Sequence, residues 1–168
     1  MIISNKSFKE FFHKELSPYT LPINIKNYLI NLLYFYLNSE QFFEKKAGET
    51  KFHEIQLLEW YEKSLVSNTQ EKLYLFKRMG DFSLYLSGFF RQAIRKKLTH
   101  LSYYQEMGQS AYHYVSQSYP PKSNVFTELS GKFKELSEIL FVIQKRSVFQ
   151  NQKKYFLNLK KLSNKKLV

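Results

Sequence analysis

The side chains of this sequence that are best suited to chemistry gather around its only aspartate, Asp81. Asp81 directly follows Gly80, and Arg78 lies three residues before it. At a break in a helix, such an acid could fix an arginine that meets an anionic ligand. The alternative is a helix cap, because aspartate is favoured where a helix begins and its charge suits the positive end of the helix dipole. The spacing favours the cap over the ligand site.

A basic cluster follows the same stretch and consists of Arg91, Arg95, Lys96 and Lys97. These cations could bind phosphate, an acidic partner or the backbone of a nucleic acid. They could equally form a solvated hinge at the end of a helix, where the dipole favours positive charge. The pattern favours the hinge, although the cluster with its neighbouring tyrosines is the first surface to test for a partner.

Tyrosines are dense around His113, at positions 103, 104, 112, 114 and 119, and we take Tyr104, Tyr112 and His113 as candidates for a ligand wall. Tyrosine also fills helix interfaces while its hydroxyl stays in contact with water, and this packing role is the interpretation that we favour. If Asp81, Tyr112 and His113 met in one pocket, the chain could be a small-molecule or metal-dependent enzyme.

No metal or catalytic set is complete in the sequence. Glu10 and His13 have the Glu-x-x-His spacing of di-iron bundles, but that site needs two such pairs and the chain has one. His53 and Glu49, four residues apart, lack a third partner on the same helix. The absence of cysteine excludes thiolate nucleophiles, disulfides and iron–sulfur clusters held by cysteine. We therefore assign no catalytic residue, metal or cofactor.

Two apolar segments within residues 73–115 must position these side chains. Apolar residues recur in each at steps of three and four, which predicts two buried helices. Small residues interrupt the apolar stripes at Gly80, Gly88, Gly108 and Ala111, so another backbone can come close there. We predict that the two helices cross at the centre of the molecule, and that Gly80-Asp81 breaks or bends the first of them.

The rest of the chain also has helical spacing, with five glycines and four prolines in all. A sheet protein needs more turns, so we predict an all-α, single-domain bundle of about six or seven helices over residues 1–168. The other expected elements are helices over 5–16, 24–37, 50–66 and 125–143, a short piece from Ser39 to Gly48, and a basic helix or tail over 144–168. The cap spacing from Asn68 to Glu71 marks the entry to the first central helix.

The charge of the chain is unevenly distributed. The formal net charge is +12, but residues 144–168 hold eight of the 26 Lys and Arg side chains and none of the 14 Asp and Glu. The remainder has 18 basic side chains against 14 acidic ones and is only mildly basic. The first residues lack an apolar signal core, and no apolar run approaches the roughly 20 residues of a spanning helix. These features predict a cytoplasmic protein without a membrane span.

The pattern Arg78-Met79-Gly80-Asp81, Ser87-Gly88-Phe89-Phe90 and Tyr103-Tyr104 to Tyr112 resembles one found in uncharacterised bacterial helical proteins. It covers residues 78–112, about a fifth of the chain. The resemblance implies a bacterial source and an all-helical fold, and it carries over no activity, cofactor or partner.

Three functions are compatible with these patterns. The preferred one is a noncatalytic regulatory or protein-interaction module, since no nucleophile–base pair, phosphate loop or metal set is evident. The second is nucleic-acid binding through the basic cluster and the Lys-rich tail. The third is the small-molecule or metal-binding helical enzyme with Asp81, Tyr112 and His113 in its pocket.

Overall fold

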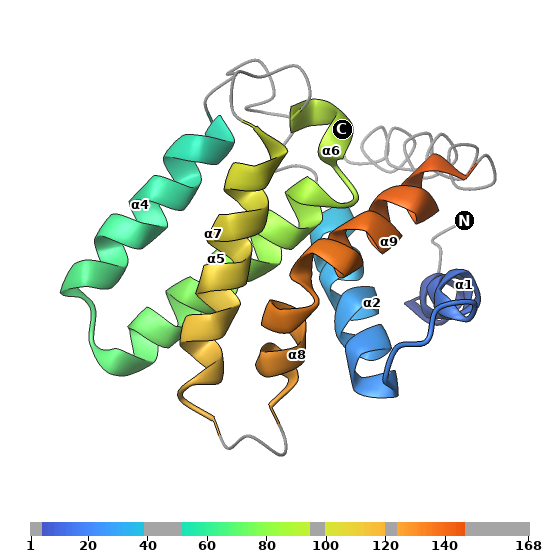
Figure 1. The fold of residues 1–168 in the computed structure, drawn as a ribbon, viewed down its shortest axis with the longest axis horizontal. Coiled ribbons are helices and arrows are strands. Elements are labelled where there is room, and N and C mark those ends of the chain that lie inside the picture. The colour runs from blue at the N-terminus through green and yellow to red at the C-terminus, as the bar shows by residue number, and fades with distance from the viewer. Residues whose placement is uncertain (1–4, 39–51, 95–99, 120–123, 147–168) are drawn as a thin grey trace, which may run out of the picture.

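The computed structural model describes residues 5–38, 52–94, 100–119 and 124–146 (Figure 1). Within these ranges the chain forms helices and no strand, so the predicted all-α bundle is confirmed. The helices are α1 (Asn5–Leu16), α2 (Ile23–Asn38), α4 (Phe52–Val66), α5 (Thr69–Ser87), the single turn α6 (Arg91–Ile94), α7 (Leu101–Ser116), α8 (Val125–Gly131) and α9 (Phe133–Lys145).

Helices α5 and α7 lie side by side at the centre of the bundle, with α4 on one side and α2, α8 and α9 on the other (Figure 1). The glycines permit this arrangement. A Cβ at Gly80 would lie 2.6 Å from the ring of Tyr112, and one at Gly88 would lie 2.8 Å from the Cβ of Leu140. At Gly108 it would overlap the ring of Phe133. The predicted close approach at the centre is therefore present.

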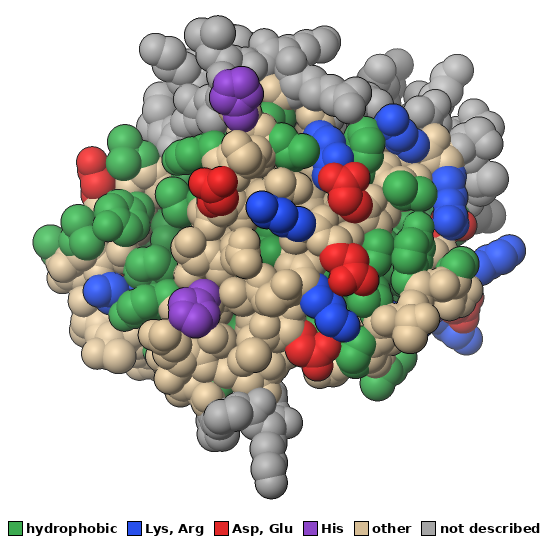
Figure 2. All heavy atoms as spheres, viewed as in Figure 1, with side chains coloured by type: hydrophobic (Ala, Val, Ile, Leu, Met, Phe, Trp, Pro, Cys, Tyr) green, Lys and Arg blue, Asp and Glu red, His purple; other side chains and the backbone are tan. Residues whose placement is uncertain are grey.

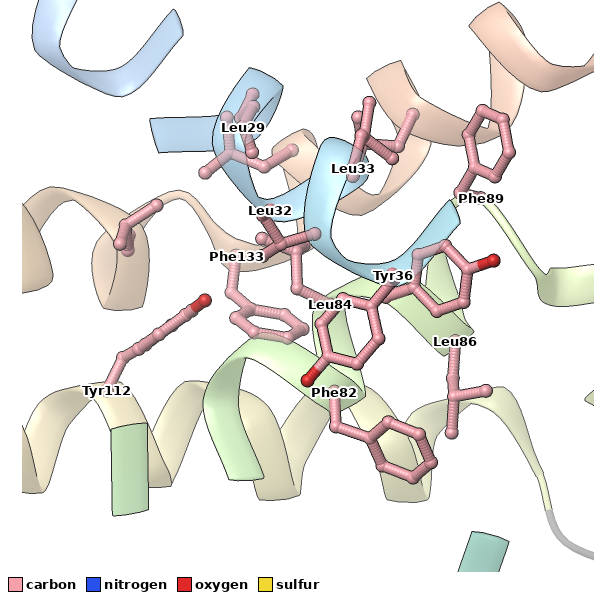
Figure 3. Close-up of a cluster of buried hydrophobic side chains, with 14 of the residues drawn as sticks. Leu29, Leu32, Leu33, Tyr36, Phe82, Leu84, Leu86, Phe89, Tyr112 and Phe133 are labelled. Carbon is pink, nitrogen blue, oxygen red and sulfur yellow. The ribbon is translucent and has the colours of Figure 1, made fainter. Parts of the chain in front are cut away.

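The core is formed by large apolar side chains that come from helices all around the bundle. Figure 3 shows Leu29, Leu32 and Leu33 of α2 meeting Phe82 and Leu84 of α5, Tyr112 of α7 and Phe133 of α9. All of these are buried. Burial of flat rings and branched side chains of this size contributes about 1.5–3 kcal/mol each, which is why α2 belongs to the core although its sequence contains several polar residues.

Two predictions about individual helices are wrong. Helix α5 continues through Gly80 and Asp81 to Ser87, so Gly80-Asp81 neither breaks the helix nor caps one. The segment predicted as one helix over 125–143 is two helices, because α8 ends at Gly131 and α9 begins at Phe133. The turn at Lys132 lets the ring of Phe133 reach the bare backbone of Gly108.

Other boundaries follow the sequence closely. Helix α1 spans the predicted residues 5–16, and the amide of Glu71 donates to the side chain of Asn68 at the start of α5. This bond is the capping interaction that the spacing of these two residues predicts. An ion pair of 2.7 Å between Arg146 and Glu15 joins the end of α9 to α1. The piece predicted from Ser39 to Gly48 and the tail from residue 147 lie outside the described residues.

None of the described helices is both long enough and apolar enough to cross a membrane.

Candidate functional site

A pocket of about 380 Å³ opens between α2 and α5, and we call it the α2/α5 pocket. Its lining consists of Tyr28, Asn31, Leu32, Phe35 and Tyr36 from α2 and Tyr74, Lys77, Arg78 and Asp81 from α5. In both helices these positions recur at intervals of one, three and four residues, so each helix presents one stripe to the space between them. The pocket therefore has aromatic walls, two cations and one carboxylate.

Asp81 is the polar centre of this site. One carboxylate oxygen, Oδ1, accepts hydrogen bonds from the hydroxyls of Tyr28 at 2.6 Å and Tyr112 at 2.7 Å. The other, Oδ2, accepts from the ammonium group of Lys77 at 2.7 Å. The carboxylate thus joins α2, α5 and α7, and both of its oxygens are used.

Gly80 explains how Tyr112 reaches this carboxylate. The ring of Tyr112 lies against the bare backbone of Gly80, at a distance that leaves no room for a Cβ. Its hydroxyl then falls beside Asp81, the next residue of α5. Gly80 and Asp81 together therefore bind Tyr112 of α7, Gly80 by contact with the ring and Asp81 by a hydrogen bond to the hydroxyl.

The two tyrosines are held in their protonated form. Burial, followed by the negative charge of Asp81, raises the pKa of Tyr28 far above its usual value. The same two causes, in the same order, raise the pKa of Tyr112. Both hydroxyls are therefore hydrogen-bond donors near neutral pH, and neither is suited to accept a proton or attack an electrophile.

Arg78 is the cation of the pocket that no carboxylate neutralises among the described residues. Its guanidinium carbon lies 4.5 Å from the ring centre of Trp60 and 5.7 Å from that of Tyr74. Such contacts stabilise the charge through the ring faces. They provide no strong acceptor for the five N–H donors of the guanidinium. Arg78 is thus held in place by ring contacts, and among the described residues its donors form no ion pair.

Arg91, the first residue of the predicted basic cluster, lies elsewhere and is only 5% exposed. Its guanidinium donates to the carbonyl of Ser87 at 2.6 Å, to Glu138 at 2.6 Å and to the hydroxyl of Ser137 at 3.1 Å. It also lies over the ring of Phe141. Arg91 therefore connects the end of α5 to α9 and is not part of an exposed basic surface.

The structure separates the remaining predicted site residues. Tyr104 is buried in α7, and His113 is exposed with its ring 3.1 Å from the side-chain nitrogen of Gln117. Asp81 and Tyr112 meet as the enzyme hypothesis requires, but His113 does not join them. Arg95, Lys96 and Lys97 lie outside the described residues. Among the described residues, no three His, Asp or Glu side chains are placed to hold a metal ion.

Three residues of the pocket were not predicted from the sequence: Lys77, Tyr28 and Tyr74. Lys77 lies four residues before Asp81, and this spacing is a sequence signal for an ion pair within one helix. Tyr28 carried no such signal, since it reads as one more apolar residue of α2. Tyr74 could not be assigned to the pocket from the sequence, because only the packing of α2 and α4 against α5 shows which face of α5 lines the pocket.

Fold and site together define an all-α bundle with an aromatic, cationic pocket between two of its helices. No family model matches the chain, and the comparisons with curated proteins and with solved structures found no match. The resemblance of residues 78–112 to uncharacterised bacterial helical proteins therefore stays a prediction.

Proposed function

We propose that the protein is a noncatalytic binding module that holds a small anionic ligand in the α2/α5 pocket. The observation that carries this proposal is Arg78, whose guanidinium faces a partly enclosed space with no carboxylate beside it among the described residues. A cation held in this way gains free energy when an anion replaces the water on its donors. The pocket volume of about 380 Å³ is within the range of small-molecule sites.

The chemistry of the neighbouring groups supports binding without catalysis. Both oxygens of Asp81 already accept hydrogen bonds, so this carboxylate is poorly placed to take a proton from a ligand. Tyr28 and Tyr112 are protonated because burial and Asp81 raise the pKa of each. A general base needs a pKa near the working pH and a free position beside the ligand. None of these three groups meets both conditions.

A variant that fills the pocket tests this proposal. Asn31 lines the pocket and is exposed, so Asn31→Trp places an indole in the opening without changing the core. The matched control is Ser110→Trp, on the exposed side of α7. We expect that, in a library of small anionic, neutral and cationic compounds, the anions give the hits by ligand-observed NMR, and that Asn31→Trp abolishes these hits while Ser110→Trp does not. Hits that survive Asn31→Trp, or a library without hits, would contradict the proposal.

A protein partner is the second candidate, and it is supported by the outer side of α4. Leu58, Leu65 and Val66 are 53%, 61% and 88% exposed there, although apolar side chains of this size usually avoid water. A photoreactive residue at position 65 should crosslink to such a partner, whereas one at the exposed Ser110 of α7 should not. Equal crosslinking at both positions would argue against a specific surface.

Nucleic-acid binding has less support from the described residues. Figure 2 shows Lys and Arg side chains interspersed with Asp and Glu on the face that carries α7, α8 and α9. Binding to a nucleic-acid backbone calls for cations that cluster. The prediction of nucleic-acid binding therefore depends on Arg95, Lys96, Lys97 and the tail. Arg95, Lys96 and Lys97 lie outside the described residues, and the tail is described only as far as Arg146.

A further inference from the structure

We infer that the ligand of the α2/α5 pocket carries a single carboxylate on a flat ring. This inference rests on the proposed function and adds the chemical class of the ligand. It follows from the charges of the pocket, the geometry of Arg78 and the shape of the pocket walls.

The charges of the pocket leave one positive charge for the ligand. Lys77 and Asp81 form an ion pair of 2.7 Å and neutralise each other. Arg78 has no such partner among the described residues, so the three charged groups sum to one unit of positive charge. A monoanion matches this charge. A dianion such as a phosphate monoester would bring a second negative charge towards Asp81, and the described lining offers no second unpaired cation to balance it.

The geometry of Arg78 selects a carboxylate among the monoanions. A guanidinium presents parallel N–H donors that match the two oxygens of a carboxylate. Its guanidinium carbon is fixed over the ring of Trp60 at 4.5 Å, so little conformational entropy remains to be lost on binding. Trp60 lies outside the pocket lining and is buried, which makes it a rigid support for the guanidinium.

The walls indicate what the rest of the ligand looks like. Phe35 of α2 and Tyr74 of α5 line the pocket and are 56% and 58% exposed. Leu32 and Tyr36 of α2 also line it and are buried. A flat ring would cover the two exposed aromatic faces and contact Leu32, and ring pairs prefer offset or edge contacts with centres about 4.5–7 Å apart. The small volume favours a ligand of one or two rings.

The probes follow from this class. Benzoate and naphthoate carry one carboxylate on a flat ring. Benzamide keeps the ring and the planar polar group without charge, and phenyl phosphate keeps the ring with a phosphate. Titration of each compound into the full chain, followed by calorimetry and NMR, gives their relative affinities.

We expect benzoate and naphthoate to bind, with benzamide weaker than benzoate by about tenfold or more, since a charge-assisted bidentate pair is lost. Phenyl phosphate should also bind more weakly than benzoate. Arg78→Met should reduce benzoate affinity about tenfold and leave benzamide unchanged, whereas Arg78→Lys should fall between Met and Arg. The control Lys72→Met removes a charge of α5 outside the pocket and should change neither affinity.

The outcomes separate this inference from the proposed function. If benzamide or phenyl phosphate binds as tightly as benzoate, and Asn31→Trp blocks it, the pocket binds ligands but the carboxylate class is wrong. If only anions of other classes give hits that Asn31→Trp abolishes, the inference is again overturned and the proposed function stands. If no compound binds in the pocket, both fail. Circular dichroism of Arg78→Met and Arg78→Lys shows whether each variant is folded.

Discussion

At the scale of single residues, the Asp81 carboxylate is the group on which most of the pocket depends. It is linked to Tyr28 and Tyr112 by two hydrogen bonds and to Lys77 by an ion pair. Tyr112 is fully buried, so its hydroxyl has no access to water if Asp81 is removed. A buried donor without an acceptor costs about 1–3 kcal/mol, and this sets the scale of the effect of substituting Asp81.

A double-mutant cycle should show this coupling. We expect Asp81→Ala to lower the free energy of unfolding by about 2–3 kcal/mol, because the hydroxyl of Tyr112 then loses its acceptor in the core. Tyr112→Phe should cost about 1 kcal/mol. In the Tyr112→Phe background, Asp81→Ala should cost clearly less than it does alone. Strictly additive effects in urea denaturation would show that the two groups do not interact.

The pKa shifts of the tyrosines predict how stability depends on pH. An unperturbed tyrosine titrates near pH 10. Burial and the charge of Asp81 raise the pKa of Tyr28 and of Tyr112 in the folded protein, so above pH 10 the unfolded chain loses protons that the folded chain keeps. The stabilisation is therefore complete below about pH 10 and is lost as the pH rises further.

The corresponding measurement is the free energy of unfolding between pH 8 and pH 11. We expect these tyrosines to cause little change in the free energy of unfolding up to about pH 10, then a fall of about 1.4 kcal/mol per pH unit for each tyrosine that stays protonated in the fold. Tyr112→Phe should make the fall shallower. Phenolate absorbance offers a second readout, and a native protein in which every tyrosine titrates at about pH 10 would refute the assignment.

At the scale of the helices, the glycines of α5 and α7 have different roles from Gly131 at the end of α8. A Cβ at Gly80 or Gly88 would come within 3 Å of a neighbouring side chain, and at Gly88 also to 3.1 Å of the backbone carbonyl of Ser137. At Gly131 a Cβ would meet nothing within 4 Å, and the backbone there has no positive φ. The same substitution should therefore have opposite effects at these positions.

We expect Gly88→Ala and Gly80→Ala to lower the free energy of unfolding by about 1–3 kcal/mol through overpacking. The matched control Gly131→Ala should leave stability unchanged or raise it by up to about 1 kcal/mol, because alanine restricts the unfolded chain more than glycine does. Chemical denaturation of the three variants measures this. Equal effects at all three positions would show that the helices do not touch at Gly80 and Gly88.

The helices also show what sequence spacing can and cannot predict. The apolar periodicity and the small residues between 80 and 111 were enough to predict two central helices in close contact. Gly80 was expected to break or bend α5 because glycine has a low helix propensity. In the structure the ring of Tyr112 occupies the space where a Gly80 side chain would lie, and the helix continues. Local propensity cannot show which neighbour uses a missing side chain, and tertiary packing therefore decides whether such a helix continues.

At the scale of the whole molecule, the class of fold was predictable and the arrangement of the helices was not. Few turn residues and helical spacing throughout indicate an all-α bundle. The contact of α2 with α5, which creates the pocket, joins residues about fifty positions apart, such as Tyr28 and Asp81. Without it, Arg78 and Asp81 look like a surface arginine and a helix cap. The sequence therefore singled out Arg78 and Asp81 as candidates, but it did not show that Tyr28 of α2 contacts Asp81.

The contact of α9 with the end of α5 explains why Arg91 was assigned to the wrong environment. Its place in a run of basic residues suggested a solvated hinge. In the folded chain α9 lies against the end of α5, and Glu138, Ser137 and the ring of Phe141 surround the guanidinium. An arginine can be buried when its donors are satisfied in this way, and no feature of its own segment predicts it.

The most direct test of the central claim is the structure of the protein crystallised with benzoate. The account predicts benzoate between α2 and α5, with its carboxylate paired to the guanidinium of Arg78 and its ring against Phe35 and Tyr74, while Lys77 stays bound to Asp81. Benzoate bound elsewhere, with the α2/α5 pocket closed by its own side chains, would contradict it.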